Sequence, residues 1–166
     1  MDIEAFAHRM VELLPRLARG LARHEHNSLS RGDITLPQLW ALEHLSRHDV
    51  GCPMNELARA LSISRPAATG LIDRLIVQKL ARRMSDHQDR RIVRVAITAK
   101  GQRILTNIWE QKRRTITSVF SQISPDDRAQ YLTTLERVVR ILTEQESSHH
   151  NTAMVTADSH QTYPAR

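Results

Sequence analysis

Hydrophobic positions recur every three or four residues along most of the chain, which predicts a mainly helical protein. The first apolar stripe runs from Ile3 to Leu21 on one face of a predicted helix. Thr35, followed three residues later by Gln38, forms a capping-box pattern that predicts the start of a second helix. We expect the buried face of this second helix to carry four apolar side chains: Leu36, Leu39, Trp40 and Leu45.

Two further helices are predicted close together, separated by a tight turn. Pro53 starts the first of them, and residues 62–64 form the turn. Ser64 supplies an N-cap oxygen for the second, which carries Pro66 in its first turn, where a missing N–H does least harm. A short helix, a turn and a helix whose first residues face outward form the pattern of a helix-turn-helix.

The hydrophobic period then changes from that of a helix to that of a strand. Val93, Val95 and Ile97 alternate with other residues, which predicts the second strand of a hairpin over residues 82–97. Thr98 supplies an N-cap for a fifth helix that ends near residue 122, and Ser124 begins a sixth. The polar, aperiodic residues 147–166 predict a disordered tail.

Basic charge is concentrated near the predicted hairpin. The chain has a net charge of +6, with 21 arginines and only 3 lysines. Arginine forms two-pronged contacts with phosphate and guanine, although a GC-rich genome also enriches this residue. Residues 74–94 contain seven basic side chains and two acidic ones, so the position of the arginines favours an interface with nucleic acid.

A short motif links this hairpin to a known family. Asp89 and Arg91, then a strand, then Thr98 and Gly101 resemble the wing signature of the MarR family, with Ile97 in place of its usual leucine. The resemblance extends from the first helix to about residue 146. It implies a winged helix-turn-helix fold with six helices, mainly α with a small β-wing, that binds double-stranded DNA at a pseudo-palindromic operator as a transcriptional regulator, most often a repressor.

The recognition segment and the wing are the expected DNA-binding parts. Arg91 at the wing tip is expected to enter the minor groove, and Arg65 to reach base edges in the major groove. Lys79 stands where many family members have glycine, so the turn into the wing must form without that residue. The complete set of expected DNA-binding residues is Ser64, Arg65, Pro66, Ala67, Ala68, Thr69, Arg74, Arg83, Asp89, Arg90 and Arg91.

The terminal helices carry more apolar residues than a small winged-helix core can cover. The resemblance therefore implies a homodimer, with a dimerisation helix and connector over 1–34, the DNA-binding domain over 35–97 and dimerisation helices over 98–146. We expect the dimer to bury four side chains in particular: Leu14, Leu17, Leu135 and Val139. A small aromatic or phenolic acid is the effector that the family implies, and Arg16, Arg23 and Trp40 are candidates to bind it, although Trp40 also suits a core position.

Other classes of protein fit the sequence poorly. No catalytic triad, glycine-rich phosphate loop or paired-carboxylate motif is present, so we expect neither an enzyme nor a cofactor. Polar residues interrupt the N-terminal apolar run and no segment is long enough to span a membrane, which favours a cytoplasmic protein. The alternative is a winged-helix protein-interaction module that does not bind DNA, a function that would not require such focused arginines.

Three side chains raise the question of metal or redox chemistry. His44 and His48 have the spacing of two metal ligands on one helical face, but no further Cys, Asp or Glu is expected to point toward them. Solvated or capping histidines are the commoner case, so no metal is expected. Cys52, the single cysteine, is expected to be a buried structural residue and not a redox switch.

Overall fold

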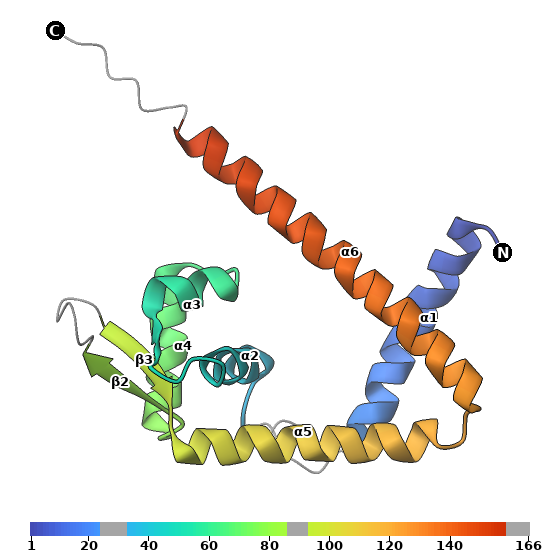
Figure 1. Ribbon diagram of the computed structural model, residues 1–166, viewed down its shortest axis with the longest axis horizontal. Coiled ribbons are helices and arrows are strands. Elements are labelled where there is room, and N and C mark those ends of the chain that lie inside the picture. The colour runs from blue at the N-terminus through green and yellow to red at the C-terminus, as the bar shows by residue number, and fades with distance from the viewer. Residues whose placement is uncertain (24–32, 86–92, 159–166) are drawn as a thin grey trace, which may run out of the picture. The chain divides into compact units, whose positions relative to one another are not determined.

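A computed structural model describes residues 1–23, 33–85 and 93–158 and confirms the predicted architecture (Figure 1). Within these residues the chain forms six helices and a small antiparallel sheet. In chain order the elements are α1 (Ile3–Arg23), α2 (Leu36–Leu45), β1 (Cys52–Pro53), α3 (Met54–Ala60), α4 (Arg65–Val77), β2 (Ala81–Ser85), β3 (Val93–Ile97), α5 (Ala99–Phe120) and α6 (Pro125–Asp158). The chain divides into two units, residues 1–117 and 118–166.

The hydrophobic core lies in the first unit, among α2, α3, α4, the sheet and the first half of α5. The strand order is β1-β3-β2, and Val95 of β3 is paired with Cys52 on one side and Arg83 on the other. The largest fully buried side chains come from all of these elements: Leu42, Leu45, Cys52, Leu57, Ile72, Leu75, Leu80, Val95 and Ile108.

One prediction about α2 is wrong. Thr35 caps the helix as expected, since its N–H donates to Gln38 Oε1 at 2.9 Å. However, Leu36 and Trp40 are exposed, and only Leu39 and Leu45 of the predicted face are buried. With 3.6 residues per turn, the buried side of the helix passes through positions 38, 41, 42 and 45, which places positions 36 and 40 on the opposite side.

Helices α3 and α4 end in the same way, with a left-handed residue that is not glycine. Ser62 has φ of 53° and Lys79 has φ of 61°. After α4, the N–H of Lys79 donates to the Ile76 carbonyl and that of Leu80 to the Leu75 carbonyl, both at 2.8 Å. This pair of bonds is a Schellman motif, so the turn predicted at Lys79 forms without glycine and holds the residue in a strained conformation.

The end of β3 is fastened to the end of α4 through the Thr-x-x-Gly motif. The Thr98 hydroxyl donates to the Lys79 carbonyl at 2.8 Å and accepts from the Gly101 N–H at 3.1 Å, which confirms Thr98 as the N-cap of α5. A Cβ on residue 101 would overlap the carbonyl oxygen of Leu80. Glycine is therefore required because the backbone of α5 lies directly against the turn after α4.

The second unit is mainly α6, which begins as predicted and ends later. The Ser124 hydroxyl accepts from the Asp127 N–H at 3.1 Å, a typical N-cap. The helix continues to Asp158, beyond the predicted start of a disordered tail at residue 147. No glycine or proline follows Pro125 within the helix, so its backbone contains no residue that would break it.

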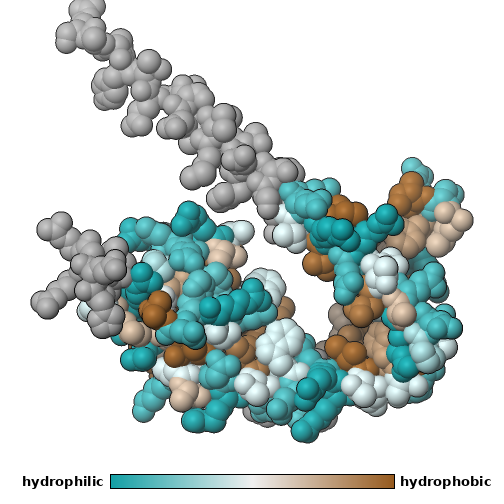
Figure 2. Space-filling model, in the orientation of Figure 1, coloured by the Kyte–Doolittle hydropathy of each residue, from teal (hydrophilic) through white to brown (hydrophobic). Residues whose placement is uncertain are grey.

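Two terminal helices keep their apolar stripes exposed in the isolated chain. On α1 these side chains include Phe6, Leu13, Leu14 and Leu17, and Figure 2 shows hydrophobic residues along the surface of this helix. On α6 they are Leu132, Leu135, Val138, Val139, Ile141 and Leu142. None of the helices in the described part of the chain is both long and apolar enough to cross a membrane.

Candidate nucleic-acid interface

The first turn of α4 forms an exposed surface at the end of a well-packed helix. Ser64, Arg65, Pro66 and Ala67 are all exposed, as predicted for a recognition segment. The Ser64 hydroxyl accepts a hydrogen bond from the Ala67 N–H at 3.3 Å, which confirms its role as N-cap. The outward-facing turn is held firmly because the opposite side of α4 is buried in the core.

The structure corrects one residue of the predicted recognition segment. Ala68 is fully buried, with 0% of its surface exposed, so it belongs to the core and cannot contact DNA. Thr69 is half-buried, and its hydroxyl donates to the Arg65 carbonyl at 3.0 Å. Ala68 precedes the buried Leu71 and Ile72 by three and four positions, so its methyl group lies on the same inner face of the helix.

Two predicted basic residues lie on different elements of the same region. Arg74 is exposed near the end of α4, and Arg83 is exposed on β2. The Arg83 guanidinium donates to Asp73 Oδ1 at 2.6 Å, which links β2 to α4. This ion pair could not be predicted from the sequence, because nothing in the local pattern relates residues 73 and 83.

The structure describes only part of the predicted wing. Asp89, Arg90 and Arg91, predicted to form the wing tip, lie outside the described residues. Arg94, part of the same basic cluster, donates to the Gly51 carbonyl at 3.0 Å. This arginine therefore fastens β3 to the turn before β1, a structural role within the cluster.

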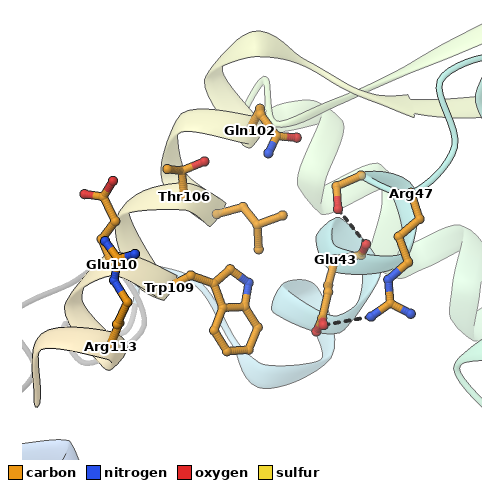
Figure 3. Close-up of a pocket in the computed structure, with 9 residues that line it drawn as sticks. Glu43, Arg47, Gln102, Thr106, Trp109, Glu110 and Arg113 are labelled. Atoms are coloured by element: carbon orange, nitrogen blue, oxygen red, sulfur yellow. Dashed lines mark hydrogen bonds and ion pairs between the residues drawn. The ribbon is translucent and has the colours of Figure 1, made fainter. Parts of the chain in front are cut away.

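The predicted effector-binding residues do not line the open cleft found between α2 and α5. Arg16 and Arg23 are exposed on α1, and Trp40 is 53% exposed on α2. An open cleft of about 520 Å³ instead lies between the end of α2 and the middle of α5 (Figure 3). Its lining residues are Glu43, Ser46, Arg47, Gln102, Leu105, Thr106, Trp109, Glu110 and Arg113.

This cleft has both an aromatic and a charged side. Trp109 reaches from α5 toward α2, and Glu43 and Arg47 lie across from it (Figure 3). Arg47 donates to Glu43 Oε1 at 3.0 Å. Trp109 holds an apolar position in the pattern of the fifth helix, but this pattern does not distinguish it as a cleft residue, since the pairing of α2 with α5 is a tertiary feature.

The structure also corrects the expectation for His44 and His48. Two further side chains of ligand type, Cys52 and Glu56, lie beside them, and the four donor atoms are all within 4.8 Å of one another. Burial, with a smaller contribution from the negative charge of nearby Glu56, raises the pKa of the Cys52 thiol to about 11. Burial, together with His48, lowers the pKa of His44. Cys52 is fully buried as expected, but it is not isolated from other reactive groups.

Comparisons with known proteins agree with this geometry. Residues 32–92 match the model of the MarR family. A curated relative, the uncharacterized HTH-type transcriptional regulator YsmB of Bacillus subtilis, is 28% identical over 102 residues, which cover 61% of this chain and 68% of the relative.

Solved structures share the fold across most of the chain. A MarR family protein from Bacillus stearothermophilus is 24% identical with a TM-score of 0.70, covering 86% of this chain and 99% of the other. A mutant of S. aureus MepR bound to an oligodeoxyribonucleotide is 23% identical with a TM-score of 0.59, with coverages of 86% and 99%. Residues 32–92 therefore match the MarR family in sequence, and the part of the chain around them has the winged-helix fold of these solved structures.

Proposed function

We propose that this protein is a sequence-specific DNA-binding repressor that acts as a homodimer on a pseudo-palindromic operator. The observation that carries the proposal is the exposed first turn of α4, where Arg65 projects from a helix whose other side is buried. A helix held in this way can enter a major groove without losing its own packing, and an arginine there can bind guanine through two hydrogen bonds.

A second line of support is the similarity to a protein seen with DNA. The S. aureus MepR mutant that shares this fold is bound to an oligodeoxyribonucleotide. Arg74 on α4 and Arg82 on β2 add exposed cations on the two elements that flank the recognition segment. Contacts of this kind with phosphate position a protein on the duplex, whereas contacts from the first turn of α4 would specify the sequence.

The homodimer is supported by the exposed apolar stripes of α1 and α6. A soluble protein seldom leaves such stripes in water, because burying them stabilises an association by about 25 cal/mol per Å² before the costs of association are counted. A pair of symmetric copies would also place two recognition helices on two half-sites, which explains why the operator is proposed to be pseudo-palindromic.

Selection from a pool of random duplexes tests the proposal without knowledge of the operator. We expect a motif with two-fold symmetry to be enriched. Arg65→Ala should weaken binding to the enriched duplex by about 1–3 kcal/mol, or roughly 5- to 150-fold, and bring it closer to binding of unrelated duplexes. Fluorescence anisotropy at one fixed salt concentration measures both affinities.

Arg9→Ala is the matched control, since it removes the same charge from α1, where Arg9 is exposed and pairs with Glu12. This variant should keep its affinity within about twofold, because α1 carries none of the residues proposed to contact DNA and the charge of an exposed side chain outside the interface is largely screened. Failure of the unmodified protein to enrich any duplex at low salt would overturn the proposal and favour the protein-interaction module.

We further propose that the cleft between α2 and α5 binds the effector, a small aromatic or phenolic acid. Trp109 offers a flat apolar surface, and Arg47 and Arg113 line the same cleft as cations for a carboxylate. Binding would weaken the complex with DNA only if the acid prefers one dimer arrangement over the other.

Salicylate is a suitable probe for this site. We expect it to quench the fluorescence of Trp109 and to weaken operator binding by about 5- to 150-fold at saturation, the range of most allosteric couplings. In Arg113→Gln both effects should need a higher salicylate concentration, whereas Arg16→Gln, a change outside the cleft, should leave both unchanged. Equal responses from the two variants would contradict this location for the effector.

A further inference from the structure

Four side chains of ligand type meet where α2, β1 and α3 come together. His44 lies in the last turn of α2, His48 in the turn that follows, Cys52 in β1 and Glu56 in the first turn of α3. The chain turns back at Gly51, whose N–H donates to the His48 carbonyl at 3.1 Å. This turn brings Cys52 and Glu56 to the two histidines.

Two of the distances among the donor atoms match those around a tetrahedral ion. Cys52 Sγ lies 3.5 Å from His44 Nε2, and His48 Nε2 lies 3.6 Å from Glu56 Oε1. In a tetrahedral zinc site, with metal–ligand bonds of about 2.0–2.3 Å, neighbouring donor atoms are about 3.3–3.7 Å apart. The two pairs therefore stand at the separation that a shared ion requires, and all four donors lie within 4.8 Å of one another.

We infer that His44, His48, Cys52 and Glu56 form a binding site for Zn²⁺. Two imidazole nitrogens, one thiolate sulfur and one carboxylate oxygen form a set that suits this ion, which accepts nitrogen, sulfur and oxygen ligands and has no preferred geometry of its own. The thiolate and the carboxylate together carry two negative charges, so the ion and its ligands are neutral overall.

The four residues also leave a path by which an ion can reach the site from solvent, because two of them are partly exposed. Cys52 is fully buried, whereas His48 and Glu56 are partly exposed, with 30% and 42% of their side chains accessible. The ion would meet the two outer ligands first and then displace the proton of the inner thiol. It would fasten the end of α2 to the start of α3, the first helix of the helix-turn-helix.

Cobalt titration of the metal-free protein gives a direct test, because Cys52 is the single cysteine of the chain. We expect one Co²⁺ per chain, a thiolate-to-cobalt charge-transfer band and the intense visible bands of a four-coordinate ion. One equivalent of Zn²⁺ should remove all of these bands, while Mg²⁺ should not, since it prefers oxygen ligands.

Variants at the outer ligands assign the site without disturbing the core. Glu56→Gln and His48→Gln should each weaken Zn²⁺ binding at least about tenfold, given that even the loss of an outer-shell partner typically weakens it 10- to 100-fold. His8→Gln, at an exposed histidine on α1, is the matched control and should bind Zn²⁺ as tightly as the unmodified protein. Circular dichroism confirms that each variant is folded.

Two results would overturn the inference. The first is a titration of the folded protein in which no charge-transfer band develops. The second is a band that persists with the same affinity in both Glu56→Gln and His48→Gln, which would mean that Cys52 binds the ion together with other ligands, such as the histidines at 149, 150 and 160.

Discussion

The hydrophobic core of α2, α3, α4, the sheet and the first half of α5 buries its apolar residues, whereas the terminal helices α1 and α6 leave similar residues exposed. In the core, side chains such as Leu42, Ile72 and Val95 are completely buried, and every surrounding element contributes to the same cluster. On α1 and α6, equally large side chains such as Leu14 and Leu135 remain about half exposed. The core is therefore complete within one chain, whereas the stripes of the terminal helices lack a covering surface in the isolated chain.

The same helical period of apolar residues can therefore encode either an intramolecular core or a surface for association. Where the neighbouring parts of the sequence form other helices and a sheet, the apolar stripe packs against them and becomes part of an intramolecular core. A stripe on a long helix at the end of the chain has fewer such neighbours, and its burial depends on what binds to it. Substitutions in the core should therefore change the free energy of unfolding, and substitutions in the apolar stripes should change the association of two chains.

The largest effect is expected in the core. Leu42→Ala should lower the free energy of unfolding by about 2–5 kcal/mol, because it removes a fully buried side chain and leaves a cavity. Val11→Ala, at an exposed position on α1, should change it by less than about 0.5 kcal/mol. Urea denaturation at one protein concentration measures the free energy of unfolding of both variants. Similar decreases in the two variants would contradict the proposed difference between the core and α1.

A charge in the stripe of α6 should act on association instead. Leu135→Asp should raise the dissociation constant of the proposed homodimer at least about 30-fold, equivalent to about 2 kcal/mol, because a carboxylate would be buried without a partner. Sedimentation equilibrium provides the measurement. Thr133→Asp, on the opposite side of the same helix, serves as the control and should leave the dimer intact; an unaffected dimer in Leu135→Asp would remove α6 from the interface.

The smallest predicted effect is a gain in stability at the end of α4. Lys79→Gly should raise the free energy of unfolding by up to about 1 kcal/mol, because glycine adopts the positive φ of 61° without steric strain. Thermal denaturation should show a higher midpoint. A lower midpoint would mean that contacts of the lysine side chain outweigh the strain, and the Schellman turn would then be sustained by more than its backbone bonds.

Local patterns predicted much of the fold because caps and turns are decided by near neighbours. Thr35, Ser64, Thr98 and Ser124 each cap the expected helix, since each cap bonds a backbone N–H three residues on or belongs to a capping box. The same reasoning failed for Trp40 and Ala68, whose burial depends on which side of a helix meets the core.

The missed features of the sites come from tertiary pairings. The Asp73–Arg83 ion pair joins a helix to a strand, and the cleft at Trp109 joins α2 to α5. The cluster at Cys52 did leave a signal, because its four members follow one another at every fourth position from His44 to Glu56. That spacing suggests one face of a single helix. The structure shows instead that the chain turns at Gly51, and this turn brings the four residues together from α2, β1 and α3.

The contact between Gly101 and the Leu80 carbonyl has a consequence for motion. The same carbonyl accepts from the Thr98 N–H at 3.0 Å, so it ties the end of β3 to the turn after α4 while the backbone of α5 rests against it. Little room remains for the first turn of α5 to pivot against its neighbours. A force applied further along α5, for example by a molecule in the cleft at Trp109, would therefore move the recognition helix and the wing strands together as a rigid body.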